Sequence, residues 1–359
     1  MPSLPTEIIV DILARLPVKT LIRFKCVCKS WRSLIADPHF VQEHLDRATK
    51  DADTHRRRLL LSTFPLQSIN YEAADEDIDA AVMFDFPLKI PNRKAEIVGS
   101  CNGLICLLVD SDSIILWNPS TRDAKELPKP YAVTDDNKLS YGFGFDSGID
   151  DYKLVRVARP ATSSDFDKTI VEVFVLKTNF WRRIDVDPNI VLYGPGNLLN
   201  GVLHWFVERE IDQDLLGAIV SFDLAAEKFD EVLLLPDPDV VNISIRDFRV
   251  LGEYPSIVCS NFDDYVEIWV MKEYGVKASW TKVVTIESET APIYEDWVAA
   301  LWFSKNDEVL IDVDGKILAM YNPKEKTRRN LMVHGDCAWF ETFMYVESLV
   351  SPFCNDGSR

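Results

Sequence analysis

The first 40 residues constrain the fold most, because they place three short amphipathic helices in a segment too small to fold stably alone. Isoleucines and leucines recur at helical spacing over residues 8–16, and Pro17 stops this first helix. A second helix is expected through Leu21 and Phe24, and a third from Val27 to Ile35. An isolated three-helix unit cannot bury so many apolar residues. The segment is therefore either a helical cap on the rest of the chain or a docking module for a partner.

Three stretches in this segment carry a resemblance to a known family. Leu4-Pro5, Leu16-Pro17-Val18 and Val27-Cys28-Lys29-Ser30-Trp31 resemble the F-box, the module that docks onto Skp1-type adaptors. The resemblance implies the substrate-recognition subunit of a Skp1–cullin–F-box ubiquitin ligase, with cullin reached through the adaptor. Some of the matching residues hold such a module together and others touch the adaptor. The adaptor-binding residues that the resemblance implies are Leu4, Pro5, Ile8, Leu16, Pro17, Val18, Leu21, Val27, Cys28 and Trp31.

Charge is unevenly distributed along the chain. Residues 1–50 hold 8 Lys+Arg against 5 Asp+Glu, a net charge of +3, whereas the whole chain holds 39 against 57. By difference, residues 51–359 hold 31 against 52, a net charge of −21. Such an acidic domain repels a nucleic-acid backbone, so we expect no nucleic-acid partner. It favours a protein client with a basic face, although solubility alone also explains the charge.

No membrane segment or metal site is expected. No apolar run approaches the ~18 residues that span a bilayer, and the chain enters its helical pattern directly after Met1-Pro2-Ser3. We therefore expect no membrane insertion, no signal peptide and a cytoplasmic or nuclear protein. No Cys-x-x-Cys pair is present, so we expect neither metal nor cofactor. The seven cysteines are interpreted as buried small apolar residues: Cys26, Cys28, Cys101, Cys106, Cys259, Cys337 and Cys354.

The domain boundaries follow from composition. A three-helix F-box is expected over residues 1–45, with a further helix opening at Asp37-Pro38 and fading into a polar stretch. A linker is expected over residues 46–57 and a β domain over 58–350. We interpret the run Arg56-Arg57-Arg58 as the solvated entrance of the first strand, rather than as a nuclear signal.

Short strands separated by turn dipeptides dominate the rest of the chain. Asn102-Gly103, Asn200-Gly201 and Asp314-Gly315 each separate two apolar runs. These dipeptides supply the positive φ angles that type I′ turns require, so each predicts a tight β-hairpin.

A degenerate repeat aligns these hairpins. Its equivalent positions Asn118, Val175, Asp223, Val270 and Asn322 lie 57, 48, 47 and 52 residues apart. A period near ~50 residues with several strands per unit is typical of kelch-type propeller blades. We predict a mainly β protein with a small N-terminal α module and a kelch-like β-propeller of about six blades. Because the repeat is degenerate, five or seven blades also fit. The closing blade is expected to pair a strand at 59–64 with one at 339–345.

The β region also resembles a family, the F-box-associated domain of plant F-box proteins. The resemblance lies in Gly99-Ser100-Cys101-Asn102-Gly103-Leu104, Trp117-Asn118-Pro119-Ser120-Thr121, Tyr141-Gly142-Phe143-Gly144-Phe145-Asp146 and Gly201-Val202-Leu203-His204-Trp205. Together with the F-box it spans nearly the whole chain. The motifs are similar to those of receptors that act on immune-receptor abundance and of pollen S-locus F-box proteins.

We expect no enzyme activity. Gly142-Phe143-Gly144 lacks the third glycine of a dinucleotide loop, so we interpret it as a turn. Asp312-Val313-Asp314-Gly315 hints at a calcium loop, but position twelve is Pro323 rather than Glu. His204 has no serine or cysteine nucleophile motif beside it, so a residue within a blade is the simpler interpretation.

The expected mechanism is positional. The F-box anchors the chain to the adaptor, and exposed aromatic and acidic residues on propeller loops hold the client. The alternative is a non-ligase scaffold that sequesters its client without ubiquitin transfer. The candidate client-binding residues are Tyr131, Asp135, Asp136, Phe166, Tyr193, Asp263, Tyr265 and Tyr294.

Overall fold

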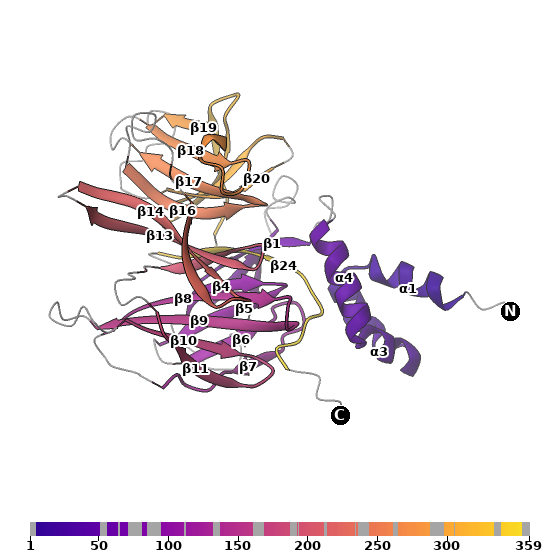
Figure 1. Cartoon of the computed structure of the whole chain (residues 1–359). Helices are drawn as coiled ribbons and strands as arrows, with labels where there is room; N and C mark the ends of the chain where they lie inside the picture. The colour runs from indigo at the N-terminus through magenta and orange to yellow at the C-terminus, as the bar shows by residue number, and fades with distance from the viewer. Residues whose placement is uncertain are drawn as a thin grey trace. The chain divides into compact units, whose positions relative to one another are not determined.

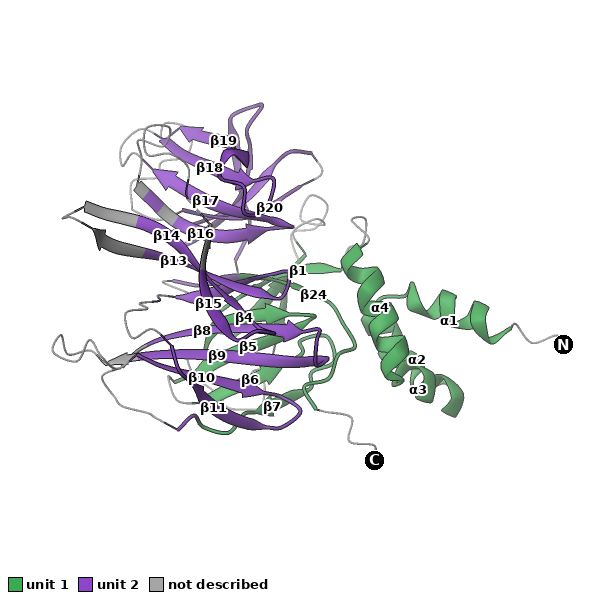
Figure 2. Ribbon diagram, in the orientation of Figure 1, with its two compact units in different colours: residues 1–129, 343–359 green, residues 130–342 purple. Residues whose placement is uncertain are grey.

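The chain folds as two compact units, residues 1–129 with 343–359 and residues 130–342 (Figures 1 and 2). Among the described residues, the first unit holds all the α-helices and two sheets, and the second unit holds three sheets. The computed structural model describes residues 5–50, 56–63, 65–70, 81–84, 95–110, 113–131, 137–160, 169–186, 192, 194–211, 214–233, 235, 244–260, 265–287, 298–304, 306–333 and 339–353.

Four helices begin the described chain: α1 (Thr6–Ala14), α2 (Val18–Phe24), α3 (Lys29–Ile35) and α4 (Pro38–Lys50). The three expected helices are confirmed, and the further helix expected after Asp37 is α4. Pro5 and Pro17 occupy the N-cap positions of α1 and α2. The side chain of Asp37 caps α4, because its Oδ1 accepts hydrogen bonds from the backbone N–H groups of His39 at 2.9 Å and Phe40 at 3.3 Å. The α4 helix continues to Lys50, so residues 46–50 of the expected linker are helical.

The helices enclose one small core, which a residue from the far end of the sequence completes. Its partly buried rim includes Ile9, Leu16, Phe24 and Trp31. The fully buried members are Leu13, Ala14, Val18, Leu21, Ile35, Phe40 and Leu349.

Two four-stranded sheets complete the first unit. The strands of one, in spatial order, are β24 (Thr342–Val346), β1 (Arg57–Leu61), β2 (Leu66–Ile69) and β3 (Ala81–Phe84). The strands of the other are β4 (Ala95–Cys101), β5 (Leu104–Val109), β6 (Ser113–Trp117) and β7 (Ala124–Glu126). Because β24 lies beside β1, the expected pairing between the first and last strands is confirmed.

The second unit contains an eight-stranded sheet and two four-stranded sheets. The large sheet runs β11 (Phe180–Ile184), β10 (Ile170–Val175), β9 (Asp151–Pro160), β8 (Asn137–Asp146), β12 (Pro195–Leu199), β13 (Val202–Ile211), β14 (Asp214–Asp223) and β15 (Lys228–Leu233). The next contains β16 (Ser244–Leu251), β17 (Tyr254–Ser260), β18 (Tyr265–Met271) and β19 (Trp280–Glu287), with the 3-10 helix η2 (Lys277–Ser279) before β19. The last contains β20 (Val298–Phe303), β21 (Val309–Val313), β22 (Ile317–Asn322) and β23 (Thr327–Asn330).

The three predicted hairpins are confirmed. Asn102-Gly103 joins β4 to β5, Asn200-Gly201 joins β12 to β13, and Asp314-Gly315 joins β21 to β22. Both residues of each dipeptide have positive φ, from 51° at Asn200 to 84° at Gly103. This is the conformation that a two-residue type I′ turn requires.

The repeat corresponds to a recurring turn between the third and fourth strands of a sheet. The Oδ1 atoms of Asn118, Asp223 and Asn322 each accept hydrogen bonds from the backbone N–H groups two and three residues later, at 2.8–3.3 Å. Four residues after each of them, and after Val175, the backbone adopts a left-handed φ of 53–67°. Four of the five aligned positions are therefore structurally equivalent, and at three of them the Asn or Asp side chain builds the turn. The fifth, Val270, lies within β18 and has no such turn after it.

The eight-stranded sheet forms because two four-stranded halves join at their first strands. β8 and β12 pair in parallel, with Tyr141 opposite Pro195 and Gly142 opposite Gly196. A Cβ atom on Gly142 would lie 2.7 Å from both Leu203 Cδ1 and Trp205 Cζ2, so only glycine fits under these side chains. The sequence interpretation of Gly142 as part of a turn is wrong, because it lies within β8.

Two further sequence expectations are wrong. Arg56 is not solvated; it is buried, and its guanidinium donates to backbone carbonyls of the helices. Cys26 and Cys28 are exposed, because they lie in the turn between α2 and α3 rather than in a core. Cys101, Cys106 and Cys259 are buried as expected, and Cys337 and Cys354 lie outside the described residues.

Candidate protein-docking surface

The helices leave large apolar side chains uncovered. Ile8 and Ile12 are each 47% exposed, and they lie four residues apart on one face of α1. Val27, between α2 and α3, is 62% exposed. Since these side chains belong to a module with a small core, covering them would bury apolar area that the module itself cannot bury. Ile8, Ile12 and Val27 form what we call the apolar docking set.

The ten predicted adaptor-binding residues divide by burial. Pro5, Ile8, Pro17, Val27 and Cys28 are exposed, and Leu16 and Trp31 are half-buried. Val18 and Leu21 are buried in the helical core, so their side chains support the surface from below. Leu4 lies outside the described residues. Sequence reasoning missed Ile12, although its spacing of four from Ile8 places both on one helix face.

The surface of the module is cationic. Its exposed cations are Arg15, Lys19, Arg23, Lys29, Arg32 and Lys50, against the exposed acids Glu7 and Asp37. Asp11 is neutralised locally: its carboxylate lies 3.0 Å from Arg15 Nη2 and 2.9 Å from Arg47 Nη2. The hydrogen bond from Arg47 holds the pKa of Asp11 below its ordinary value. Apolar side chains among cations fit a partner whose surface is apolar and acidic.

A thiol caps α3 at this surface. Cys28 Sγ accepts the backbone N–H of Trp31 at 3.4 Å and lies 3.1 Å from Ser30 Oγ. The hydrogen bond with Ser30 lowers the pKa of the Cys28 thiol. The thiol therefore holds the turn in shape as serine does at an N-cap.

The buried side chains of His44 and Arg56 hold the turn between α1 and α2 in place. His44 Nε2 donates to the carbonyl of Leu16 at 3.0 Å, and Arg56 Nη2 donates to the same carbonyl at 3.3 Å. Burial lowers the pKa of His44 to about 4, so the ring is neutral at pH 7. The corner that presents Pro17 is therefore fixed from beneath by residues that sequence reasoning did not select.

Only two of the predicted client-binding residues lie in the described part of the chain. Tyr131 is 60% exposed, and its ring packs edge-to-face on that of Phe180 at 5.8 Å. Tyr265 begins β18 and is half-buried. The structure does not bring these two together. The other six predictions, Asp135, Asp136, Phe166, Tyr193, Asp263 and Tyr294, lie outside the described residues.

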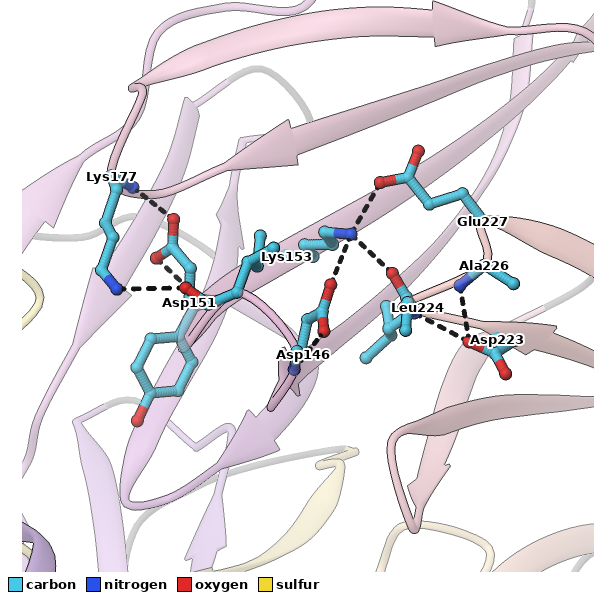
Figure 3. A network of polar contacts seen from close by, with 12 residues as sticks. Asp146, Asp151, Lys153, Lys177, Asp223, Leu224, Ala226 and Glu227 are labelled. Atoms are coloured by element: carbon cyan, nitrogen blue, oxygen red, sulfur yellow. Dashed lines mark hydrogen bonds and ion pairs between the residues drawn. The ribbon is translucent and has the colours of Figure 1, made fainter.

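A buried polar network in the second unit has a structural role (Figure 3). Lys153 is 4% exposed, and its Nζ lies 2.7 Å from Asp146 Oδ2, 2.6 Å from Glu227 Oε1 and 2.6 Å from the carbonyl of Leu224. Burial raises the pKa of Asp146, but the hydrogen bond and charge of Lys153 together with the backbone N–H groups of Gly148 and Ile149 outweigh it, so that pKa lies below its ordinary value. All three ammonium protons have acceptors, so the network ties β9 to the turn after β14.

The two side chains weighed as enzymatic candidates are also held by the fold. His204 is buried, its Nε2 lies 2.7 Å from Tyr274 Oη, and burial lowers its pKa to about 4. Asp312 accepts hydrogen bonds from Thr342 Oγ1 at 2.8 Å and from the N–H of Gly315 at 3.0 Å. Burial raises the pKa of Asp312 to about 6.

Within the described part of the chain, no three His, Cys, Asp or Glu side chains gather in a group that could hold a metal ion. No described helix has both the length and the apolar character that a membrane crossing requires.

Known proteins resemble this chain over nearly its whole length. The family model for the F-box associated beta propeller domain matches residues 58–354, and that for the F-box domain matches residues 1–43. F-box protein CPR1 of Arabidopsis thaliana is 32% identical, covering 98% of this chain and 89% of its own. F-box/kelch-repeat protein At3g23880 of the same plant is 29% identical, covering 98% and 96%. TolB from Acinetobacter baumannii aligns with a TM-score of 0.45 at 9% identity, over 86% of this chain and 71% of that one.

Proposed function

The chain belongs to the F-box proteins that carry an F-box associated β-propeller domain, and we propose that it is the substrate-recognition subunit of a Skp1–cullin–F-box ubiquitin ligase. In this proposal α1–α4 bind a Skp1-type adaptor, which links the chain to cullin. The propeller holds a client protein in the cytoplasm or nucleus. The chain transfers no bond itself; it positions a lysine of the client.

The observation that carries the proposal is the apolar docking set on a cationic module. Ile8, Ile12 and Val27 stay exposed in a segment that the F-box model matches. Apolar anchors of this size, surrounded by charge, are the kind of residue that carries most of the energy of a protein interface.

The β domain is proposed to be a propeller of about six blades. Among the described strands, four sheets have four strands each, and the eight-stranded sheet divides at the β8–β12 pair into two more groups of four. Four antiparallel strands per group match the blade of a kelch-type propeller. The net charge of −21 outside residues 1–50 favours a client with a basic face.

The proposal is tested by binding of the purified full chain to a purified Skp1-type adaptor and then to cullin. We expect wild-type binding, and a loss of at least ~100-fold in adaptor affinity for Ile8→Asp with Ile12→Asp, because buried carboxylates at two anchors are not compensated. The matched control is Val82→Asp with Met83→Asp on β3, two similarly exposed apolar residues of the same unit at 53% and 55%. The control should bind as wild type does.

Two results would contradict the proposal: no adaptor binding by the wild-type chain, or equal loss in both double variants. The scaffold alternative predicts adaptor binding without client turnover. It is separated from the ligase by client abundance in cells, which rises on proteasome inhibition only if the client is degraded. Client partners captured by the wild type and lost in Tyr131→Ala with Phe180→Ala would locate the client surface at that aromatic pair.

A further inference from the structure

We propose that residues 347–350, here called the strap, fix the docking helices onto the first propeller sheet, and that Asn118 is the positioning residue of this joint. The proposal rests on the proposed function for its purpose, since a receptor must hold its client at a set distance from the adaptor. The strap follows β24, and both its partners belong to the first unit.

On the sheet side, Asn118 recognises the backbone of the strap. The side chain is fully buried in the turn after β6, and its Nδ2 donates to the carbonyls of Ser348 at 3.1 Å and Val350 at 2.7 Å. Its Oδ1 is already used by the turn, accepting from the N–H groups of Ser120 and Thr121. One amide therefore shapes the turn with its oxygen and holds the strap with its nitrogen.

The β4–β5 hairpin provides a second contact on this side. Ser348 Oγ donates to the carbonyl of Asn102 at 2.8 Å. A Cβ atom on Gly103 would lie 2.6 Å from the carbonyl oxygen of Val346, so the hairpin glycine lets the strap approach closely. Both turns at this end of the sheet thus contact the strap.

On the helix side, Leu349 contacts the module, and Glu347 bonds to the entrance of β1. Leu349 is 5% exposed and is a member of the helical core. The N–H of Glu347 donates to the carbonyl of Arg56 at 2.8 Å, and Glu347 Oε1 lies 3.1 Å from Arg58 Nε. Leu349 therefore contacts the helices, Ser348 contacts the β4–β7 sheet, and Glu347 contacts the entrance of β1.

Arg56 extends the joint into the helices. Its guanidinium donates to the carbonyls of Ala14, Leu16 and His44, each at 3.3 Å. These carbonyls end α1 or lie within α4, so one side chain ties both helices to the entrance of β1.

The strap gives the module a second attachment besides the covalent connection between α4 and β1. A single connection lets the module rotate, which spreads the positions that a client lysine samples and lowers its effective concentration at the ligase. Two attachments, the covalent connection and the strap that lies beside it, restrict that rotation more than one does. The strap thereby sets the geometry of the receptor without touching adaptor or client.

The test is the Asn118→Asp variant with Asn322→Asp as its matched control. Both substitutions keep an Oδ acceptor for the same turn, but only at position 118 does the lost amide hold the strap. In Asn118→Asp a carboxylate also faces two carbonyl oxygens, which repel it. We expect Asn322→Asp to behave as wild type.

The readout is the distance distribution between spin labels at Gln42→Cys on α4 and Glu126→Cys on β7, measured by pulsed electron paramagnetic resonance. Both positions are exposed, and the labels are placed in the full chain with Cys26, Cys28, Cys337 and Cys354 changed to Ser. We expect a narrow distribution in the wild type and in Asn322→Asp. In Asn118→Asp we expect a distribution at least twofold broader, with the same adaptor affinity as the labelled chain that keeps Asn118.

A distribution that stays narrow in folded Asn118→Asp would overturn the proposal. If that variant fails to fold, Ser348→Ala is measured instead. It removes the Oγ contacts to Asn102, Asn118 and the N–H of Val350 but keeps the bonds from Asn118 to the strap carbonyls. Partial broadening is expected, and an unchanged distribution is the contrary result. The distance distribution is measured in the free chain and needs no bound adaptor. Failure of the wild type to bind adaptor would therefore overturn the proposed function while leaving this measurement valid.

Discussion

The helical module and the β4–β7 sheet belong to the same compact unit, yet they bury their apolar residues to different degrees. In the sheet, all six residues of β5 and four of the five in β6 are buried. In the module, Ile8, Ile12 and Val27 are exposed, and the core includes Leu349 from outside it. The sheet is complete in the free protein, whereas the module has one apolar surface filled by the strap and another left for a partner.

The difference shows how a small module can stay folded while keeping a docking surface. Four short helices cannot bury enough area to be stable and also expose large apolar side chains. Contacts from the strap and from Arg56 supply the missing stabilisation on one side. With this stabilisation, the module can leave Ile8, Ile12 and Val27 exposed.

The largest expected effect comes from the same Leu→Ala substitution in the core of the helical module and in the β4–β7 sheet. Leu21→Ala and Leu107→Ala each remove a fully buried side chain, at a cost of about 2–5 kcal/mol. In the module this is a large share of its stability, so Leu21→Ala should remove amide-exchange protection from α1–α4 and abolish adaptor binding. Leu107→Ala should lower the melting temperature while the helices stay protected. Equal protection of the helices in both variants would show that the module has more stability than its core suggests.

Acidification should have opposite effects on the stability of the helical module and of the β20–β23 sheet. The folded-state pKa of His44, about 4, lies below its ordinary 6.5, so the unfolded module binds more protons between these values. The module should therefore lose up to about 3 kcal/mol as pH falls from 6.5 to 4. Asp312 has the opposite sign: its pKa is raised to about 6 from 3.8, so the folded sheet gains stability over that range.

Hydrogen exchange measured between pH 7 and pH 5 checks this pair of signs. Protection of α4 should fall, and His44→Gln, which keeps a side-chain N–H donor without titrating, should reduce that fall. A module whose protection does not change with pH would exclude His44 as the acid-sensitive group.

A smaller effect extends the comparison to the eight-stranded sheet. Gly142→Ala places a methyl group 2.7 Å from Leu203 and Trp205, which should cost about 1–3 kcal/mol through overpacking at the β8–β12 pair. Gly148→Ala is the control, since its added methyl group meets only Asp146 Oδ1, at 3.2 Å. Denaturant midpoints that coincide for the two variants would contradict the close packing of β8 on Trp205.

The smallest expected effect is in a hairpin turn. Asn200 has a φ of 51°, a left-handed conformation that asparagine tolerates better than alanine. Asn200→Ala should cost about 1 kcal/mol, while Asn200→Gly should be close to neutral. Chemical denaturation of both variants gives the difference, and an alanine variant as stable as the glycine variant would count against the turn geometry.

The local elements could be predicted because their causes are local. Asn-Gly and Asp-Gly dipeptides require positive φ wherever they occur, so all three hairpins were predictable. The repeated turn was predictable because Asn118, Asp223 and Asn322 each bond to their own following backbone. The helices follow from apolar spacing and from prolines at their starts.

Contacts between distant segments could not be predicted in this way. The run Arg56-Arg57-Arg58 indicates only a charged strand entrance, and the carbonyls that bury Arg56 lie in α1, α4 and the turn after α1. The local sequence around Gly142 fits a turn. The need for glycine within β8 comes from Trp205, 63 residues later, which leaves no room for a Cβ atom. Cys28 has the burial preference of its residue type, but the turn that contains it faces solvent.

The sequence by itself determined the helices, the hairpins, the repeated turn and the family, since each depends on residues close together or on motifs at set spacing. Only the tertiary structure decided which apolar residues of the helices are core and which are exposed, and that residues 347–350 join the helices to the first sheet. The physical reason is that burial depends on which distant segments meet. Asn118 illustrates both levels: its oxygen builds a turn that the local sequence predicts, and its nitrogen binds a segment 230 residues away.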